Sequence, residues 1–281
     1  MTSTFEALRQ FLYARSGLSL EGDKLYLLES RLLPIAREAG LTDLAGLMKR
    51  LETGERDLAQ AVIDAMTTNE TFFFRDRVPF DKFRNVMLPH LLDARAGERR
   101  LRIWCAACST GQEPYSLAML LDEEARRLTG WNVEILATDL SRRVIDSAKL
   151  GLYSQFEVQR GLPITMLLRY FQRAGDRWQV NEFLRSRVTF REFNLMSDFR
   201  PLGTFDAIFC RNVLLYFDVP TKRDILARLS KALAPDGFML MGSAETVIGL
   251  SDAFVPHGDH PTLFVHKRMQ RQRPELMLVA N

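Results

Sequence analysis

The chain has 281 residues, 47% hydrophobic and 26% charged, which is enough for one large domain or two modest ones with real cores. Its formal net charge of +3 is close to neutral and argues against a protein that binds nucleic acid. Three cysteines exclude a disulfide framework, and no apolar run approaches the roughly 20 residues of a membrane-spanning helix. The N-terminus has no apolar signal core, so we expect a globular protein in the reducing cytoplasm.

The first 68 residues predict an all-helical domain. Apolar residues recur at helical spacing in a segment that ends at Ser16-Gly17, and again from about Lys24 to Ala39. Two shorter helices are expected near residues 43–51 and 56–66. No strand pattern occurs before residue 100, so the helical domain is expected to be separate from the rest of the chain.

From residue 101 onward, strand patterns alternate with helix patterns. Strands are expected at residues 101–105, 133–137, 188–193, 205–210, 238–241 and 263–266. Helices are expected at residues 112–127, 141–149 and 221–233. This alternation predicts an α/β domain with a mainly parallel sheet that is covered on both faces.

The alternation lapses between Gly151 and Arg187. Within this stretch, residues 169–180 predict a short hairpin about Ala174-Gly175-Asp176. We therefore expect a small antiparallel β-subdomain inserted at about residues 165–187. The tail, residues 268–281, is expected to be flexible.

A turn of small residues, Ala107–Gly111, joins the first strand to the first helix of this domain. In doubly wound folds a nucleotide cofactor lies at this place, over the helix N-terminus. Asp139 ends the second strand, where a carboxylate can accept hydrogen bonds from both ribose hydroxyls; the alternative, a cap for the next helix, suits Ser141 better. The turn lacks G-x-G-x-x-G, so S-adenosylmethionine is favoured over NAD without excluding it.

Five ordered motifs closely resemble those of the chemotaxis receptor methyltransferases, the CheR family. They are residues 67–75 (TTNETFFFR), 108–116 (CSTGQEPYS), 137–139 (ATD), 194–195 (NL) and 210–217 (CRNVLLYF). The resemblance runs from about residue 5 to residue 267. It implies a helical, receptor-facing domain (1–68), a linker that contributes to the active site (69–80) and a Rossmann-like S-adenosylmethionine methyltransferase domain (81–267).

The resemblance also implies a reaction. The family transfers methyl from S-adenosylmethionine to chemoreceptor glutamates, which yields glutamate 5-O-methyl esters for sensory adaptation and S-adenosylhomocysteine. A glutamate, with a pKa of about 4.3, is already ionised at neutral pH, so this protein-glutamate O-methyltransferase chemistry needs no general base and no metal.

Site residues are assigned from the matched motif positions. The resemblance implies catalytic, substrate-positioning roles for Arg75 and Tyr216. It implies that Glu113 binds the amino group of the methionine moiety, that Asp139 holds the ribose and that Asn194 lies near the adenine. The expected cofactor-binding set is Asn69, Thr71, Arg75, Gly111, Glu113, Asp139, Asn194, Leu195, Arg211 and Asn212.

Receptor contacts are expected on the second helix of the helical domain, where Lys24, Arg31 and Arg37 stand. A solvated helix face is the alternative for these three residues. Family members often carry arginines where this chain has Pro34 and Ile35, so docking by charge is weaker here. The hairpin loop at residues 174–176 is short, which predicts an enzyme that does not bind a receptor C-terminal pentapeptide.

Two other features are expected to be structural. Cys105 and Cys108 form a C-x-x-C that is typical of redox sites, but both positions suit small apolar packing, as does Cys210. His257, Asp259 and His260 stand in a Pro/Gly-rich segment that predicts a plain loop and no metal site.

Two other functions stay open at this point. One is a methyltransferase with a non-receptor substrate, and the other is a non-catalytic signalling module that binds the cofactor. The helical bundle of a chemoreceptor is the expected partner, without membrane insertion, and a monomer is the expected state.

Overall fold

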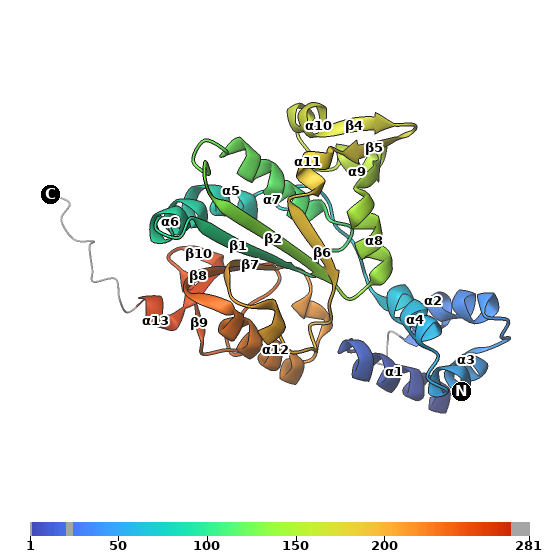
Figure 1. Cartoon of the computed structure of the whole chain (residues 1–281). Helices are drawn as coiled ribbons and strands as arrows, with labels where there is room; N and C mark the ends of the chain where they lie inside the picture. The colour runs from blue at the N-terminus through green and yellow to red at the C-terminus, as the bar shows by residue number, and fades with distance from the viewer. Residues whose placement is uncertain (1, 21–24, 271–281) are drawn as a thin grey trace.

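The computed structural model describes residues 2–20 and 25–270, and Lys24 and most of the predicted tail lie outside them. A helical domain lies at one corner of a larger α/β domain (Figure 1). Its helices are α1 (Thr2–Ser16), α2 (Leu25–Glu38), α3 (Leu44–Glu52) and α4 (Arg56–Met66). The four expected helices are therefore all present.

The helical domain has a hydrophobic core of its own. Side chains four residues apart on α1 and on α2 point inward, as helical periodicity requires: Leu8, Leu12, Leu28 and Leu32 are all fully buried. Asp43 caps α3, because its side chain accepts a hydrogen bond from the Gly46 N–H at 2.8 Å.

The larger domain is built on a seven-stranded sheet in the order β6-β2-β1-β7-β8-β10-β9. The strands β6, β2, β1, β7 and β8 are mutually parallel, and β10 is antiparallel to both β8 and β9. The strand bounds are β1 (Arg100–Ala106), β2 (Asn132–Asp139), β6 (Val188–Glu192), β7 (Phe205–Cys210), β8 (Leu233–Met241), β9 (Phe254–His257) and β10 (His260–His266). This order confirms the predicted doubly wound α/β class.

Helices cover both faces of this sheet, and successive residues of β1 serve the two faces in turn. Ile103 and Cys105 belong to one core cluster, while Trp104 and Ala106 belong to the other. The first face is covered by α7 (Gln112–Glu123) and the second by α12 (Val219–Ala232), and α8 (Arg142–Leu150) packs against β6 and β2 (Figure 1). Ser141 caps α8 by accepting a hydrogen bond from the Val144 N–H, as predicted.

Helices that the sequence did not predict precede the first strand of the sheet. Residues 78–94 form α5 (Val78–Lys82), a π-helical turn (Phe83–Met87) and α6 (Leu88–Ala94). These turns are short and interrupted by prolines, so they show no long periodic pattern. They are nevertheless firmly packed, because Phe80, Phe83 and Leu91 are buried against the sheet.

The inserted subdomain begins earlier than predicted. The hairpin of β4 (Phe171–Ala174) and β5 (Arg177–Val180) is present, but β5 also pairs with β3 (Leu152–Ser154), so the small sheet has the order β3-β5-β4. Short helices α9 (Gln155–Gln159), α10 (Ile164–Tyr170) and α11 (Glu182–Arg185) complete it. A three-residue strand is too short to show alternation, which is why the expected start at residue 165 was wrong.

Three further expectations need correction. Helix α7 ends at Glu123 rather than at residue 127. The segment around His257 is not a plain loop, because β9 and β10 form an antiparallel hairpin there. At the start of the predicted tail, residues 267–270 form a helical turn, α13 (Lys267–Gln270), and residues 271–281 lie outside the described residues.

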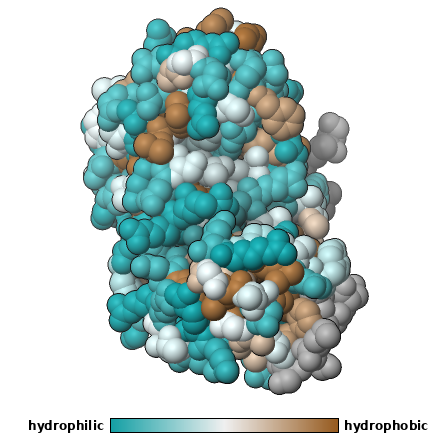
Figure 2. Space-filling model, turned by 90° about the vertical axis from the view of Figure 1, so that its right-hand side faces the viewer, coloured by the Kyte–Doolittle hydropathy of each residue, from teal (hydrophilic) through white to brown (hydrophobic). Residues whose placement is uncertain are grey.

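The helical domain presents a mostly hydrophilic face to solvent, but hydrophobic side chains gather over part of it (Figure 2). None of the helices within the described ranges is long and apolar enough to cross a membrane.

Candidate active site

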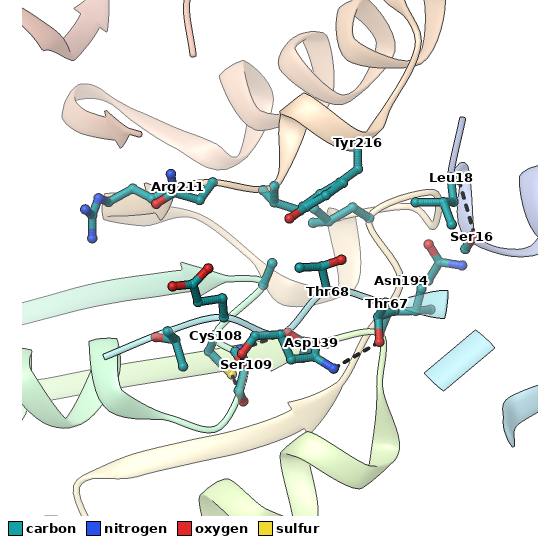
Figure 3. A pocket seen from close by; sticks show the side chains of 18 of the residues that line it. Ser16, Leu18, Thr67, Thr68, Cys108, Ser109, Asp139, Asn194, Arg211 and Tyr216 are labelled. Carbon is teal, nitrogen blue, oxygen red and sulfur yellow. Dashed lines mark hydrogen bonds between the residues drawn. The ribbon is translucent and has the colours of Figure 1, made fainter. Parts of the chain in front are cut away.

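A cleft lies between the helical domain and the carboxyl ends of the parallel strands, and its space of about 1030 Å³ is partly open to solvent. This is the edge at which doubly wound folds bind their ligands. Figure 3 shows Tyr216 and Arg211 on one side of the cleft, Asp139 and Ser109 on the other, and Thr68 between them. The cleft is lined by nine of the ten predicted cofactor residues and by Tyr216: Asn69, Thr71, Arg75, Glu113, Asp139, Asn194, Leu195, Arg211, Asn212 and Tyr216.

Strained backbone is concentrated around this cleft. Seven non-glycine residues within the described ranges have a positive φ, and all but Arg99 lie in the three segments 74–77, 107–109 and 212. These segments carry or adjoin Arg75, Ser109 and Asn212, which line the cleft. Conformations of this kind cost free energy and persist at sites where the backbone must approach a ligand.

Asp139 is buried at the end of β2 and is held by the backbone. Its Oδ2 accepts a hydrogen bond from the Ser109 N–H at 2.9 Å, and its Oδ1 accepts one from the Ser141 N–H at 3.0 Å. Each carboxylate oxygen therefore keeps a lone pair for a hydroxyl donor. Burial raises the pKa of the Asp139 carboxyl, against the opposing effect of the two backbone donors.

A buried arginine joins three segments of the site. Arg211, at the end of β7, pairs through Nη1 with Glu113 Oε2 at 2.8 Å and through Nη2 with Asp76 Oδ2 at 2.7 Å. Its Nη2 also donates to the backbone oxygen of Arg75 at 3.0 Å. Burial raises the pKa of Glu113, and the Arg211 cation opposes that shift. The Arg211 side chain is 2% exposed, so its charge depends on these carboxylates.

Arg75 lies half-buried on the wall of the cleft. Its Nη1 donates to the backbone oxygen of Glu70 at 2.7 Å, and its guanidinium lies 5.7 Å from the centre of the Phe72 ring. Arg160 pairs with Glu70 at 2.7 Å and lies 4.3 Å from the same ring. Phe72 and Glu70 thus hold both arginines in place and restrict the directions in which Arg75 can point.

The helical domain forms part of the cleft wall. The end of α1 reaches the loop after β7, where the Ser19 N–H donates to the backbone oxygen of Tyr216 at 3.0 Å. Asn194 Nδ2 donates to the backbone oxygen of Arg15 at 2.6 Å. Ser16, Leu18 and Ile63 of this domain line the cleft beside Tyr216, and Figure 3 shows Ser16, Leu18 and Asn194 close together. No local motif marked these three residues, because only the packing of two domains brings them here.

Gly111 is the one predicted cofactor residue that does not line the cleft. It adopts φ +94° at the N-cap of α7, and a Cβ there would lie 3.0 Å from Ala148 Cβ and 3.2 Å from the Tyr153 hydroxyl. Its place is structural, since the left-handed turn aims the preceding residues at the cleft.

A Gly111→Ala variant is expected to lose about 1–3 kcal/mol of unfolding free energy, since the new methyl group is strained and crowded. Urea unfolding measures the loss. Gly175→Ala is the matched control, because Gly175 has φ +64° but no atom within 4 Å of its Cβ position. Equal losses in the two variants would show that crowding at Gly111 has no effect.

The residues present suit S-adenosylmethionine. Asp139 and Glu113 are buried carboxylates of the kind that could accept hydrogen bonds from ribose hydroxyls and an amino group, and Leu140, Phe193 and Leu195 offer apolar surface of the kind that an adenine ring needs. Among the residues that the structure describes, no group of three or more His, Cys, Asp or Glu side chains is placed to hold a metal ion. Cys105, Cys108 and Cys210 are buried free thiols in the core clusters, which confirms their predicted packing role.

Acid is expected to weaken binding of S-adenosylhomocysteine. Because burial raises the pKa of both Asp139 and Glu113, these carboxyls take up protons at a higher pH than exposed carboxyls, and each proton removes an acceptor for the ligand. Affinity should therefore fall between neutral pH and the unperturbed carboxyl range near 4. Calorimetry checks this, and an Asp139→Asn variant should bind more weakly with a shallower pH dependence. Affinity that is constant over this range would contradict the assignment.

The predicted receptor-facing residues differ in their surroundings. Lys24 lies outside the described residues. Arg31 directs Nη1 to the last carbonyls of α4, including the Met66 oxygen at 3.1 Å, so that nitrogen already has a partner within the chain. Arg37 is exposed, and Pro34 beside it is exposed as well.

A parallel sheet with a small-residue turn, a strand-end carboxylate and a cleft at its carboxyl edge is the arrangement with which doubly wound folds bind a nucleotide cofactor. Comparison with known proteins makes this specific. Residues 69–260 match the profile "CheR methyltransferase, SAM binding domain", and residues 3–67 match "CheR methyltransferase, all-alpha domain". The chain belongs to the CheR methyltransferase family, and S-adenosylmethionine is its methyl donor.

Relatives of similar length agree. The chain is 44% identical over 254 residues to chemotaxis protein methyltransferase 1 of Pseudomonas aeruginosa, covering 89% of this chain and 92% of that protein. It is 43% identical to chemotaxis protein methyltransferase Cher2 of Pseudomonas putida, with the same coverage. It is 36% identical to chemotaxis protein methyltransferase of Escherichia coli, covering 90% of this chain and 88% of that protein.

Proposed function

We propose that this protein transfers the methyl group of S-adenosylmethionine to glutamate side chains in the cytoplasmic helical bundle of chemoreceptors. The products are glutamate 5-O-methyl esters and S-adenosylhomocysteine. The observation that carries the proposal is the cleft itself, which opens between a helical domain and a cofactor edge and carries Arg75 and Tyr216 on its wall. The names of the relatives, all chemotaxis methyltransferases, support a receptor substrate.

The proposed methyl transfer requires few catalytic groups from the protein. When bound, S-adenosylmethionine supplies a methyl group activated by a sulfonium. The acceptor is a glutamate carboxylate that is ionised at neutral pH, so no base is required. The tasks left to the chain are to align the acceptor and to exclude water, since opposite charges neutralise each other in the reaction.

We assign these tasks to named side chains. Arg75 attracts the acceptor carboxylate and fixes its plane, because a guanidinium pairs with a carboxylate through two parallel hydrogen bonds. The Tyr216 hydroxyl borders the same space and donates to the acceptor. Asp139 and Glu113 hold the cofactor, and the Arg211 cation keeps Glu113 ionised for that role.

Receptor docking is assigned to the exposed surface of the helical domain. Arg37 remains available as a cation, while Arg31 Nη1 is bound to α4. The hydrophobic side chains on this domain (Figure 2) and the exposed Pro34 indicate a contact that is partly apolar, with charge as the smaller contribution. The short 174–176 turn supports binding without a pentapeptide tether.

One experiment tests the function. The protein is incubated with methyl-labelled S-adenosylmethionine and receptor cytoplasmic domains, and alkali-labile label is counted. We expect label on receptor glutamates, located by peptide mass spectrometry. Label on another substrate, or none with intact cofactor binding, would favour a different methyltransferase or a non-catalytic module respectively.

A further inference from the structure

A buried side-chain carboxylate that belongs to none of the matched motifs contacts the backbone of the segment Arg211–Tyr216. Glu245, in the loop after β8, is 8% exposed. Its carboxylate accepts four hydrogen bonds, and all four come from backbone N–H groups. Oε2 accepts from Asn212 at 2.7 Å and Gly242 at 2.8 Å, and Oε1 accepts from Val213 at 2.9 Å and Leu214 at 2.7 Å.

Three of the four donors belong to successive residues. Asn212 has φ +58°, and Val213 comes next with φ −127° and ψ −38°, so their N–H groups converge on one point. A concave set of backbone N–H groups of this kind binds anions. Here the anion is a side chain of the same protein, which therefore stabilises the positive φ of Asn212.

The turn at Asn212–Leu214, which the Glu245 carboxylate holds, is preceded and followed in the chain by residues that line the cleft. Arg211 precedes it and extends to Glu113. Tyr216 comes after it in a short 3-10 turn, in which the Tyr216 N–H donates to the Val213 oxygen at 3.2 Å. A displacement of the turn would therefore move the Tyr216 ring in the cleft.

The neighbouring Gly242 leaves room for this arrangement. A Cβ at Gly242 would lie 2.8 Å from Glu245 Oε2 and 3.0 Å from the Asn212 nitrogen. Any side chain there would push the carboxylate and the turn apart, so the sequence Gly242-Ser243-Ala244-Glu245 forms one compact unit with the catalytic segment.

We infer that Glu245 is a positioning residue whose carboxylate fixes the backbone of Asn212–Leu214 and thereby places Tyr216 for methyl transfer. The inference rests on the proposed function, in which Tyr216 contacts the acceptor. A Glu245→Gln replacement keeps the shape but sets an NH₂ group against two of the four N–H donors, so the turn loses about half of its support.

A double-mutant cycle on the full-length protein tests the inference. At saturating substrates, Glu245→Gln is expected to lower kcat for receptor methylation by about 10²-fold in the wild-type background, because a small misplacement of a positioning group has such an effect. In a Tyr216→Phe background the same change should cost less than about threefold, because the hydroxyl that it places is gone. The inference would be overturned if Glu245→Gln lowered kcat by the same factor in the wild-type and the Tyr216→Phe backgrounds.

Amide hydrogen exchange gives a second readout that needs no receptor. The peptide covering residues 211–217 should exchange faster in Glu245→Gln than in the wild-type protein, and faster also in Gly242→Ala, which keeps the carboxylate but crowds it. Unchanged exchange in both variants would contradict the inference. If the wild-type protein leaves receptors unlabelled, the proposed function fails and exchange alone decides the role of Glu245.

Asp206→Asn is the matched control for both measurements. Asp206 is 8% exposed and lies near the start of β7, at the end of that strand away from Arg211, where it pairs with Arg95 at 2.9 Å. Its loss should lower stability without changing exchange in the 211–217 peptide or the coupling to Tyr216. The same coupling in this control would show that any buried carboxylate has this effect, and would overturn the assignment to Glu245.

Discussion

An Arg75→Ala variant is expected to lose about 10²–10³-fold in kcat for receptor methylation, the loss that accompanies removal of one aligned charged donor. Affinity for S-adenosylhomocysteine should change much less, because Asp139 and Glu113, the proposed cofactor-binding carboxylates, are unchanged. An Arg75→Lys variant keeps the charge but not the two parallel donors, so we expect it to recover only part of the rate. Receptor labelling at saturating cofactor gives kcat, and calorimetry gives the affinity.

Arg77→Ala is the control for this prediction. Arg77 is an exposed arginine in the same segment and also has a positive φ, but it does not line the cleft. Wild-type kcat in both Arg75 variants would contradict the role of Arg75. A comparable loss in Arg77→Ala would show that the segment, and not the Arg75 guanidinium, is responsible.

Replacement of Arg211 by methionine should produce the largest loss of stability at the site, about 3–5 kcal/mol, because it leaves a buried carboxylate without its cation. Urea unfolding measures the loss. The surface pair Arg200–Asp198 supplies a control, since the Arg200 side chain is 91% exposed and Arg200→Met should leave stability unchanged. An Arg211→Met protein as stable as the wild type would show that the buried ion pair contributes nothing.

The loss in Arg211→Met should depend on pH. Burial raises the pKa of Glu113, and without Arg211 that pKa rises further. Consider pH values between the pKa of Glu113 in the unfolded chain, near 4.3, and its higher pKa in the folded variant. In this pH range the folded state binds a proton that the unfolded state has released. Stability of the variant therefore falls as the pH rises through this range, and the deficit relative to the wild type should be smaller in acid.

The sequence predicted those parts of the fold that have a strong local pattern. The parallel strands are apolar and recur at regular intervals, and Ser141 marks the start of α8, so both could be located. The helical turns of residues 78–94 could not, because they are short and acquire their stability by packing on the sheet. The strand β3 is likewise fixed by its pairing with β5, not by its own three residues.

The sequence predicted which residues line the candidate site, but it did not predict the ion pairs and hydrogen bonds that connect them. Asp139 and Glu113 both line the cleft, where their motifs had placed them. One carboxylate partner of Arg211, Asp76, lies 135 residues away in the chain, and three of the four donors to Glu245 lie 31 to 33 residues before it. No pattern within a short window reports contacts of this kind, since they exist only once the sheet and the linker have packed together.

The contact between α1 and the Tyr216 loop limits how far the two domains can be treated as interchangeable parts. The helical domain contributes Ser16, Leu18 and Ile63 to the cleft and donates the Ser19 N–H to Tyr216. A chimaera that carries the helical domain of another relative would thus change the shape of the cleft beside Tyr216. A chimaera of two relatives keeps this contact intact only when the end of α1 and the Tyr216 loop are exchanged as a pair.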